Sequence, residues 1–351
     1  MSPSEAPRGR QHQSPPESPR RSRRDDDVVR DAVATYAERW AETDAATGRF
    51  LELVTGLLDE AGINYLSVTG RTKSVESFAG KAARIHDGRL LHPDPLTDIT
   101  DQIGLRVITY VHGDVSAVAD LLGDELAVLD DRDLGQETAN EGRWGYASRH
   151  LLVSVDASRT VPPSLESLRR RSASVQVRTV LQHAWAEFEH DIRYKGSVPA
   201  EHAPDLDRRF TLAAGLLELA DREFSAIRDR LQEVAPEPRP APDEDPRIAA
   251  TDLAAFLAGR YSDAGWSRTD HYAWVSGLLL ELGITSLGEL ARALDDVDEA
   301  SVSAHMGYKY PPGAVRRLDD TLLAAYGERY VGLTGNAHRQ GALEGRLAKL
   351  R

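Results

Sequence analysis

Residues 174–195, SVQVRTVLQHAWAEFEHDIRYK, constrain the fold more than any other segment of the chain. Apolar and polar side chains alternate over residues 174–178, which predicts a strand with Gln176 and Arg178 on one face and valines on the other. From Thr179 the pattern predicts a helix that carries Trp185, Glu187, His190, Tyr194 and Lys195. An Arg and a Gln on a covered strand are costly unless they meet a ligand or a charged partner. The segment therefore predicts the floor of a phosphate site.

The composition limits the classes of protein that fit. A chain of 351 residues can hold two modest domains, or one domain with extensions. The formal net charge of −13 argues against a general nucleic-acid coat and against binding to an anionic membrane surface. No cysteine is present, which excludes disulfides and thiolate zinc sites. No apolar run approaches the roughly 18 residues of a spanning helix, and the N-terminus lacks the apolar core of a signal peptide, so a cytoplasmic protein is expected.

Four segments follow from composition. Residues 1–26 are rich in Pro, Ser and Arg without apolar periodicity, which predicts a disordered leader. Residues 27–233 hold the strand and helix patterns, and residues 234–246 are a linker by their Pro content. Residues 247–351 predict a helical module of short helices near 253–257, 271–282, 287–294 and 319–330.

Within the second segment, strand and helix patterns alternate. Strands are predicted at 63–69, 105–111, 146–155 and 174–178, and helices at 74–84, 115–122, 179–194 and 203–233, with Ser74 capping the first of these helices. This order predicts an α/β (α+β) fold, a mixed sheet flanked by helices, followed by an all-helical C-terminal module.

A first polar cluster lies where the first predicted strand passes into a helix. It contains Arg71, Lys73, Ser77 and Lys81, and the last two are four residues apart on one helical face. Three cations and a hydroxyl at a helix start suit a triphosphate. A solvated basic face is the other interpretation.

A second cluster, DITDQIGLR, precedes the buried strand that contains Arg106. An acid just before a buried strand is well placed to hold Mg²⁺, because this ion prefers oxygen ligands, and Asp101 is the candidate. Taken alone, this cluster is more typical of an aspartate that only caps a turn.

A third cluster, GYASRH, alternates along another strand. Tyr146, Ser148 and His150 share a face opposite an apolar one. An aromatic ring there could stack on a base. A tyrosine at a sheet edge is the alternative.

Taken in order, the patterns R-x-K-x(3)-S-x(3)-K, D-x-x-G-x-R, G-Y-x-S-x-H and Q-V-R-T with W-A-E-x-E-H and Y-K resemble the RelA/SpoT alarmone synthetases over about residues 60–200. The resemblance implies a nucleotidyltransferase-like fold. It also implies transfer of the β,γ-pyrophosphate of ATP to the 3′ hydroxyl of GDP or GTP, which makes (p)ppGpp-type alarmones. ATP, the guanine nucleotide and Mg²⁺ are the partners and cofactor implied.

The resemblance also implies residue roles. Arg71, Lys73, Ser77 and Lys81 would contact ATP phosphates, and Asp101 would hold Mg²⁺. Tyr146 would stack on guanine, with His150, Gln176 and Arg178 lining the site. Asp101, Gln176 and Arg178 are the expected catalytic residues.

One position departs from the family pattern. Two residues before Gln176 the family usually has a Glu, a second acid near the metal and the attacking hydroxyl, and this chain has Ser174. A serine cannot act as a general base near neutral pH, and loss of such a group lowers rates on the order of 10²–10⁴-fold. Glu187 and Glu166 are candidate substitutes.

Three functions follow. Bifunctional members of the family carry a hydrolase domain before the synthetase, but only about 60 residues precede the motifs here, fewer than such a domain needs. The His190-Asp191 dipeptide lies inside the predicted helix and is interpreted as structural. A single-function synthetase is therefore expected. A relative that modifies the 3′ end of tRNA is a second hypothesis, because the leader is basic. A catalytically impaired nucleotide sensor that signals through residues 247–351 is the third, because of Ser174. The sequence leaves homo-oligomerisation open.

Overall fold

The computed structural model describes residues 23–135, 148–155, 163–195, 203–233, 245–308 and 312–351. The chain divides into two compact units. The first comprises Met1–Ala41 and Lys73–Ile99, and the second comprises Glu42–Thr72 and Thr100–Arg351.

The first unit is built on α1 and α3. Its described elements are α1 (Arg23–Glu38), α3 (Val75–Ala82), β2 (Ile85–His86), β3 (Arg89–Leu90) and α4 (Pro95–Asp98). The rings of Tyr36 and Phe78 stack at 4.2 Å between centroids and join α1 to α3. Helix α1 begins at Arg23, inside the range expected to be disordered, because acidic residues in its first turn favour a helix N-terminus. Residues 1–22 lie outside the described residues.

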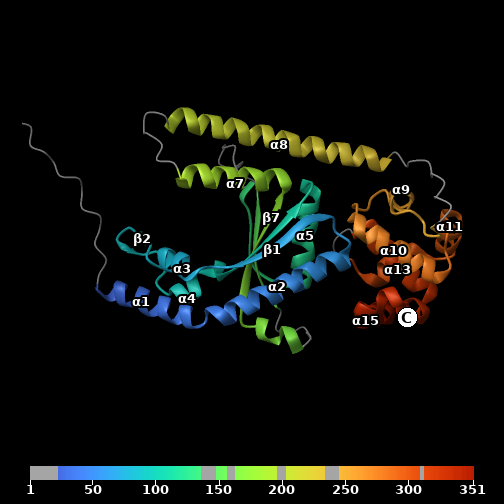
Figure 1. Ribbon diagram of the computed structural model, residues 1–351, viewed down its shortest axis with the longest axis horizontal. Coiled ribbons are helices and arrows are strands. Elements are labelled where there is room, and N and C mark those ends of the chain that lie inside the picture. Colours follow the sequence, from blue (N-terminus) through green and yellow to red (C-terminus); the bar gives the residue numbers. More distant parts are fainter. Residues whose placement is uncertain (1–22, 136–147, 156–162, 196–202, 234–244, 309–311) are drawn as a thin grey trace, which may run out of the picture. The chain divides into compact units, whose positions relative to one another are not determined.

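The second unit contains a mixed five-stranded sheet in the order β1-β4-β7-β6-β5. Strands β1 and β7 of this sheet are labelled in Figure 1. Its strands are β1 (Tyr65–Thr72), β4 (Ile103–Thr109), β5 (Ala127–Asp133), β6 (Arg149–Ser154) and β7 (Ser172–Thr179). Strands β4 and β7 are parallel, and the other neighbours are antiparallel. The mixed sheet flanked by helices is the fold class that the sequence predicts.

The two faces of the sheet differ in chemistry. Leu105, Val107, Val175 and Val177 point to one face and are at most 2% exposed. This face packs against α2 (Trp40–Ala61) and α5 (His112–Glu125), which together with it form one hydrophobic core. The alternating residues of β4, β6 and β7 therefore present their polar side chains on the opposite face.

Strand β5 is absent from the sequence-based prediction. It carries the sequence AVLDDRD at the sheet edge, and most of its side chains are exposed. An edge strand that buries neither face lacks the apolar alternation by which strands are recognised.

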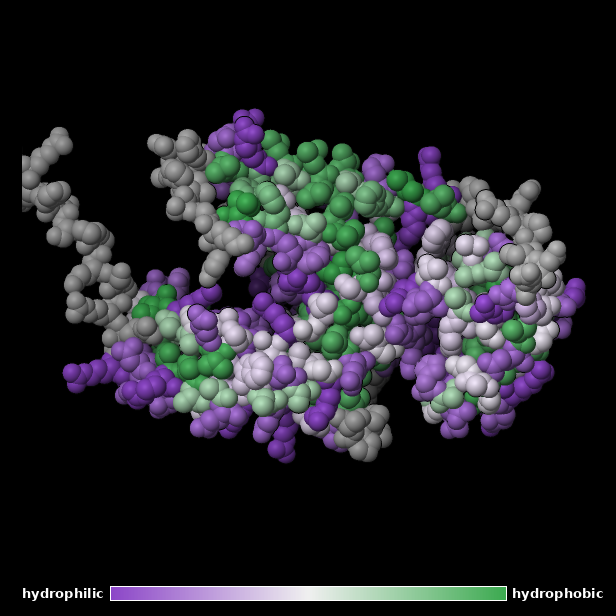
Figure 2. Space-filling model, in the orientation of Figure 1, coloured by the Kyte–Doolittle hydropathy of each residue, from purple (hydrophilic) through white to green (hydrophobic). Residues whose placement is uncertain are grey.

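Two helices follow β7. Helix α7 (Val180–Lys195) begins with a reciprocal cap, in which Thr179 and Gln182 each accept a hydrogen bond from the backbone N–H of the other. Helix α8 (Ala203–Glu233) lies alongside α7 (Figure 1), and buried Asp221 accepts a hydrogen bond from the Thr179 hydroxyl at 2.7 Å. Figure 2 shows hydrophobic side chains exposed along α8.

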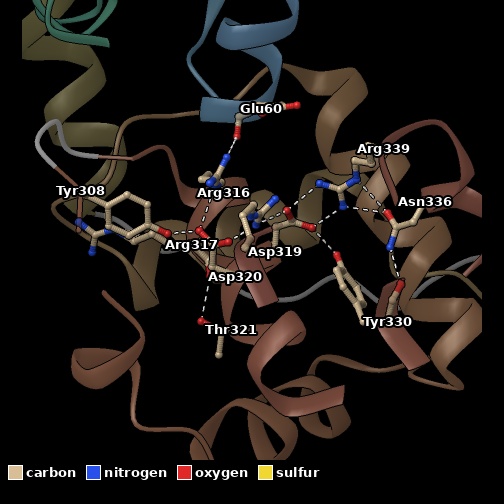
Figure 3. A network of polar contacts seen from close by, with 11 residues as sticks. Glu60, Tyr308, Arg316, Arg317, Asp319, Asp320, Thr321, Tyr330, Asn336 and Arg339 are labelled. Atoms are coloured by element: carbon tan, nitrogen blue, oxygen red, sulfur yellow. Dashed lines mark hydrogen bonds and ion pairs between the residues drawn. The ribbon is translucent and has the colours of Figure 1, made fainter. Parts of the chain in front are cut away.

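Residues 245–351 fold into helices around a separate core. The elements are α9 (Ala250–Arg260), α10 (Thr269–Leu282), α11 (Leu287–Asp295), α12 (Glu299–Met306), α13 (Ala314–Tyr326), α14 (Glu328–Val331), the 3₁₀ helix η3 (Thr334–Arg339) and α15 (Gln340–Leu350). An ion network joins α13, η3 and α15 (Figure 3). Asp319 is 3% exposed at its side chain and pairs with Arg339 at 2.6 Å and with Arg346 at 2.7 Å. Asp320 pairs with Arg316 at 2.8 Å and also with Arg346.

The helix predicted at 319–330 is wrong in its limits. Helix α13 begins at Ala314 and ends at Tyr326, and a separate short helix follows. Arg316, Arg317, Asp319 and Asp320 look like a solvated stretch in sequence, but Asp319 and Asp320 are buried. Charges that neutralise one another across helices have no signature in hydropathy.

No helix that the structure describes has, by itself, the length and apolar composition to cross a bilayer, and α10 with α11 meets that test only as a pair bent by 78°.

The C-terminal end of α2 is capped by the helical module. The backbone carbonyls of Glu60, Ala61 and Gly62 accept hydrogen bonds from the Arg316 guanidinium at 2.6 Å, the Gly313 N–H at 3.3 Å and the Ser267 hydroxyl at 2.8 Å, respectively. The first of these bonds is visible in Figure 3. A helix leaves its last carbonyls without partners inside the helix, so donors from outside stabilise it. The module therefore completes the turn from α2 into β1.

Replacing Gly313 by Ala tests this contact. A Cβ at Gly313 would lie 2.3 Å from the carbonyl oxygen of Gly62, and both atoms belong to rigid backbone. We expect Gly313→Ala to lower the free energy of unfolding by about 1–3 kcal/mol, measured by urea denaturation. Gly265→Ala is the control, because nothing lies within 4 Å of a Cβ there. Equal stability of the two variants would contradict the contact.

Candidate functional site

A row of polar side chains crosses the sheet on the face opposite the core. Arg106 of β4 is paired in register with Gln176 of β7, and Gln176 is paired with His150 of β6. Residues paired in register on neighbouring strands point to the same face. The structure thus brings together Gln176 and His150, which the sequence named, with Arg106, to which it gave no role.

Arg178 lies on the same face, two residues beyond Gln176, and is only 7% exposed. Burial, followed by the nearby charge of Arg106, lowers the pKa of Arg178 to about 10, and Glu187 opposes this shift. Two guanidinium groups near one another are stabilised by an anion. This part of the face is therefore suited to a phosphate.

Helix α7 lies over β7 and β4 and adds an acid and an imidazole. Glu187 accepts a hydrogen bond from Arg106 at 2.7 Å, and its carboxylate lies 3.8 Å from Nδ1 of His183. Burial and then the charge of Arg106 lower the pKa of His183, which favours the neutral form of its ring. Its buried Nδ1 has no hydrogen-bond partner among the described residues.

Small residues lie at the end of the face where β4 and β7 begin. Gly104 pairs with Ser174 on β7 and with Arg71 on β1. Carbon and nitrogen atoms of the Arg71 side chain lie 3.7–3.9 Å from the position of a Cβ on Gly104, so this side chain crosses β4 above the glycine. Gly104 therefore leaves room for the Arg71 side chain on the polar face.

Asp101 lies in the 3₁₀ turn η1 (Thr100–Gln102), which immediately precedes β4 and contacts β7. Among the residues that the structure describes, no cluster of three or more His, Cys, Asp or Glu side chains could hold a metal alone. Mg²⁺ often takes only one or two protein carboxylates and completes its shell with substrate phosphates and water. Asp101 at the edge of this cationic face fits that arrangement.

The predicted ATP-phosphate cluster is divided between the units. Arg71 belongs to the second unit, and Lys73, Ser77 and Lys81 belong to the first. The Lys73 carbonyl accepts hydrogen bonds from the Tyr36 hydroxyl at 2.7 Å and from the Trp40 indole at 3.1 Å. Ser74 caps α3, as predicted, by accepting from the N–H of Ser77. These bonds fix the backbone from which the cluster projects.

Other predicted residues lie apart from this face or outside the described residues. Tyr146 lies in the range 136–147, which the structure does not describe. Glu166 pairs with Arg169 at 2.7 Å within one turn, and Arg169 lowers its pKa. Of the two candidate substitutes for the missing acid, Glu187 is the one on the polar face. Arg106 is the site residue to which the sequence gave no role. It lies two positions after Gly104 on β4 and so shares its face, and this alternation is the sequence signal that would have assigned Arg106 to the site.

Comparisons with known proteins identify the family of the chain. Residues 70–198 match the family model described as "Region found in RelA / SpoT proteins". GTP pyrophosphokinase YjbM of Bacillus subtilis (strain 168) is 31% identical over 170 residues, which are 47% of this chain and 73% of that protein. The chain belongs to the RelA/SpoT family. The match covers all the predicted site residues of this RelA/SpoT protein, and the predicted resemblance is confirmed.

Two further similarities each cover about half of this RelA/SpoT protein. GTP pyrophosphokinase YwaC of Bacillus subtilis (strain 168) is 26% identical over 147 residues, 41% of this chain and 66% of that protein. The crystal structure of the small alarmone synthetase 1 from Bacillus subtilis is 24% identical, with a TM-score of 0.45, and the match covers 57% of this chain and 100% of that one.

Proposed function

We propose that this RelA/SpoT protein is a Mg²⁺-dependent GTP pyrophosphokinase that makes (p)ppGpp-type alarmones. The 3′ oxygen of GDP or GTP attacks the β-phosphorus of ATP, and the bond between this phosphorus and the α,β-bridging oxygen breaks. AMP leaves, and the hydroxyl proton passes to a base or to water. The family and the name of the relative YjbM support this reaction.

The buried guanidinium of Arg178 carries the proposal. A side chain that is 7% exposed and whose pKa is lowered beside Arg106 gains stability when an anion arrives. In pyrophosphate transfer, charge spreads over the phosphoryl oxygens, and fixed cations that meet this charge supply much of the catalysis. Arg178 and Arg106 are fixed cations of this kind.

The remaining roles follow the family pattern. Arg71, Lys73, Ser77 and Lys81 hold the phosphates of ATP. His150 and Gln176 line the site beside the acceptor, and Tyr146 stacks on its guanine. Asp101 holds Mg²⁺, which neutralises charge on the transferred group when it is bound.

The general base is the point at which this chain departs from the family, because Ser174 stands where the family usually has an acid. Glu187 is an acid on the same face, but Arg106 binds it at 2.7 Å. An ion-paired carboxylate is a weaker base than a lone one. This favours a second candidate function, a nucleotide sensor that binds without turnover.

The test compares the wild type with Ser174→Glu in the presence of labelled ATP, Mg²⁺ and GDP, GTP or tRNA. We expect the wild type to transfer label slowly to GDP or GTP, and the variant to do so on the order of 10²-fold faster, because it regains a base. Ser172→Glu, on the same face of β7, is the control and should leave the rate unchanged.

The outcomes separate the hypotheses. Binding of nucleotide by calorimetry with no turnover in either protein supports the sensor. Label on tRNA alone supports the tRNA hypothesis. Failure of the folded wild type to bind ATP or a guanine nucleotide contradicts the proposal.

A further inference from the structure

Thr72, the last residue of β1, is tied to helix α2 by a short chain of hydrogen bonds. Its hydroxyl donates to the carboxylate of Asp44 at 2.8 Å, and the Thr47 hydroxyl lies 2.8 Å from the same Thr72 oxygen. Each hydroxyl has one hydrogen and a carboxylate only accepts, so Thr72 donates to Asp44 and Thr47 donates to Thr72. The Thr43 carbonyl, 3.0 Å away, is the alternative acceptor for Thr47. Two aligned bonds that end on a charge strengthen each other, and we refer to Asp44, Thr47 and Thr72 as the Thr72 anchor.

Helix α2 lies close to β1 at this anchor. A Cβ on Gly70 would lie 3.2 Å from Leu105 and 3.3 Å from the methyl carbon of Thr47, so the glycine gives the helix room to approach. Side chains alternate along a strand, so Thr72 faces α2 with Gly70, whereas Arg71 points to the polar face. The anchor therefore holds the strand from the side opposite to Arg71.

The first turn of α2 is also tied to the residue that precedes β7. Arg171 donates to the buried hydroxyl of Thr43 at 3.1 Å and pairs with Glu42 at 3.3 Å. Strands β1 and β7 lie on the two sides of β4, and the end of β1 is level with the starts of β4 and β7. One helix thus fixes both neighbours of β4 at the edge of the sheet where Asp101 precedes this strand.

Thr72 is also the residue at which the chain leaves the second unit, because Lys73 belongs to the first. The residues proposed to hold the phosphates of ATP therefore change unit directly after the anchor. A group that grips phosphate must be fixed, since a misplacement of about 1 Å can lower a rate on the order of 10²-fold. We propose that the Thr72 anchor is a positioning device for ATP, which holds the end of β1 so that Arg71 meets the phosphates. The anchor has this role only if Arg71 binds ATP, as in the proposed function.

The first test compares Thr72→Val with Thr72→Ser in the labelled-ATP assay. Valine has nearly the shape of threonine and suits a strand, but it lacks the hydroxyl. We expect the KM for ATP to rise about tenfold in Thr72→Val while kcat stays within about threefold, because Arg71 grips the phosphates before and during transfer alike. Thr72→Ser keeps the hydroxyl and should restore the KM of the wild type. Loss of a merely structural bond would lower the temperature of unfolding without dividing KM from kcat in this way.

Asp44→Ala tests the same anchor from the side of the helix. Asp44 is exposed, and alanine favours a helix more than aspartate does. The temperature of unfolding should therefore stay within about 2 °C of the wild type, while the KM for ATP rises at least about threefold. Ser167→Ala is the matched control, because it removes a bond to α2, from Arg49 at 2.7 Å, that does not involve β1. This control should leave the KM unchanged.

Calorimetric titration with ATP separates the two proposals. When chemistry is slow, KM equals Kd, so Thr72→Val should also show the tenfold weaker binding by calorimetry. If the folded wild type does not bind ATP, the proposed function fails and the role of the anchor fails with it. If the wild type binds ATP and Thr72→Val binds it as tightly, only the role of the anchor is wrong. A Thr72→Ser protein that keeps the tenfold loss, or a Ser167→Ala protein that shares it, would also contradict that role.

Discussion

Replacing Arg178 by Met is expected to abolish pyrophosphate transfer while it stabilises the ligand-free protein. We expect kcat/KM to fall on the order of 10³-fold, because the fixed cation that meets the phosphoryl charge is lost. The free energy of unfolding should rise by about 2 kcal/mol, because burial and the neighbouring Arg106 disfavour the charged form of Arg178. Both are measured on one preparation, by labelled-ATP assay and by urea denaturation.

Arg149→Met is the matched control, since Arg149 lies on β6 but faces the core side of the sheet. It pairs with both oxygens of Asp131, at 3.0 and 2.8 Å. Its loss should lower stability and leave kcat/KM within about twofold. If Arg178→Met also lost stability together with activity, Arg178 would be a structural residue and the phosphate role would be wrong.

Replacing Asp319 by Asn is expected to cause the largest loss of stability in the chain, about 3–5 kcal/mol, because it leaves Arg339 without its buried counter-charge and Arg346 with Asp320 alone. Thermal unfolding followed by circular dichroism measures this, since residues 245–351 are mainly helical. Asp263→Asn is the control: Asp263 pairs with Arg317 but is 73% exposed, so its loss should cost less than about 1 kcal/mol.

The same aspartate makes stability depend on pH. Burial alone would raise the pKa of Asp319, but Arg346 and Arg339 outweigh it and hold the pKa well below its usual range. A carboxyl group with a lowered folded-state pKa stabilises the protein above its unfolded pKa of about 3.9, and the contribution is lost as the pH falls further. The wild type should therefore lose stability below about pH 4, and Asp319→Asn should lose less. Parallel pH curves for the two proteins would show that this ion network does not stabilise the fold.

The sequence predicts well those parts of the fold where a periodic pattern meets a buried surface. Alternation in residues 174–178 identified β7, because Val175 and Val177 are buried in the core. The limits of α8, predicted as 203–233, are confirmed. Both elements have local apolar patterns that tertiary packing preserves.

The parts that escaped prediction depend on contacts between distant residues. Strand β5 is held by edge pairing with β6 rather than by burial. The start of α13 was missed because Arg316 and Arg317 in its first turns are neutralised by Asp320 and by the distant Asp263, respectively. In the site, Arg106 and Glu187 are 81 positions apart, and only the fold brings them together. The family pattern named His150, Gln176 and Arg178, whereas the pairing of Arg106 with Glu187 could be seen only in the structure.

The cap on α2 also sets an order of events as the chain is made. The donors to its last carbonyls come from Ser267, Gly313 and Arg316, more than 200 residues later in the sequence. N-terminal segments leave the ribosome first and fold as soon as their partners exist. The turn that leads into β1, and so toward Arg71, is completed only after the helical module has been synthesised. A nascent chain interrupted before this module thus carries all the residues proposed to bind nucleotide but lacks the cap on α2, so the turn into β1 depends on synthesis of residues 267–316.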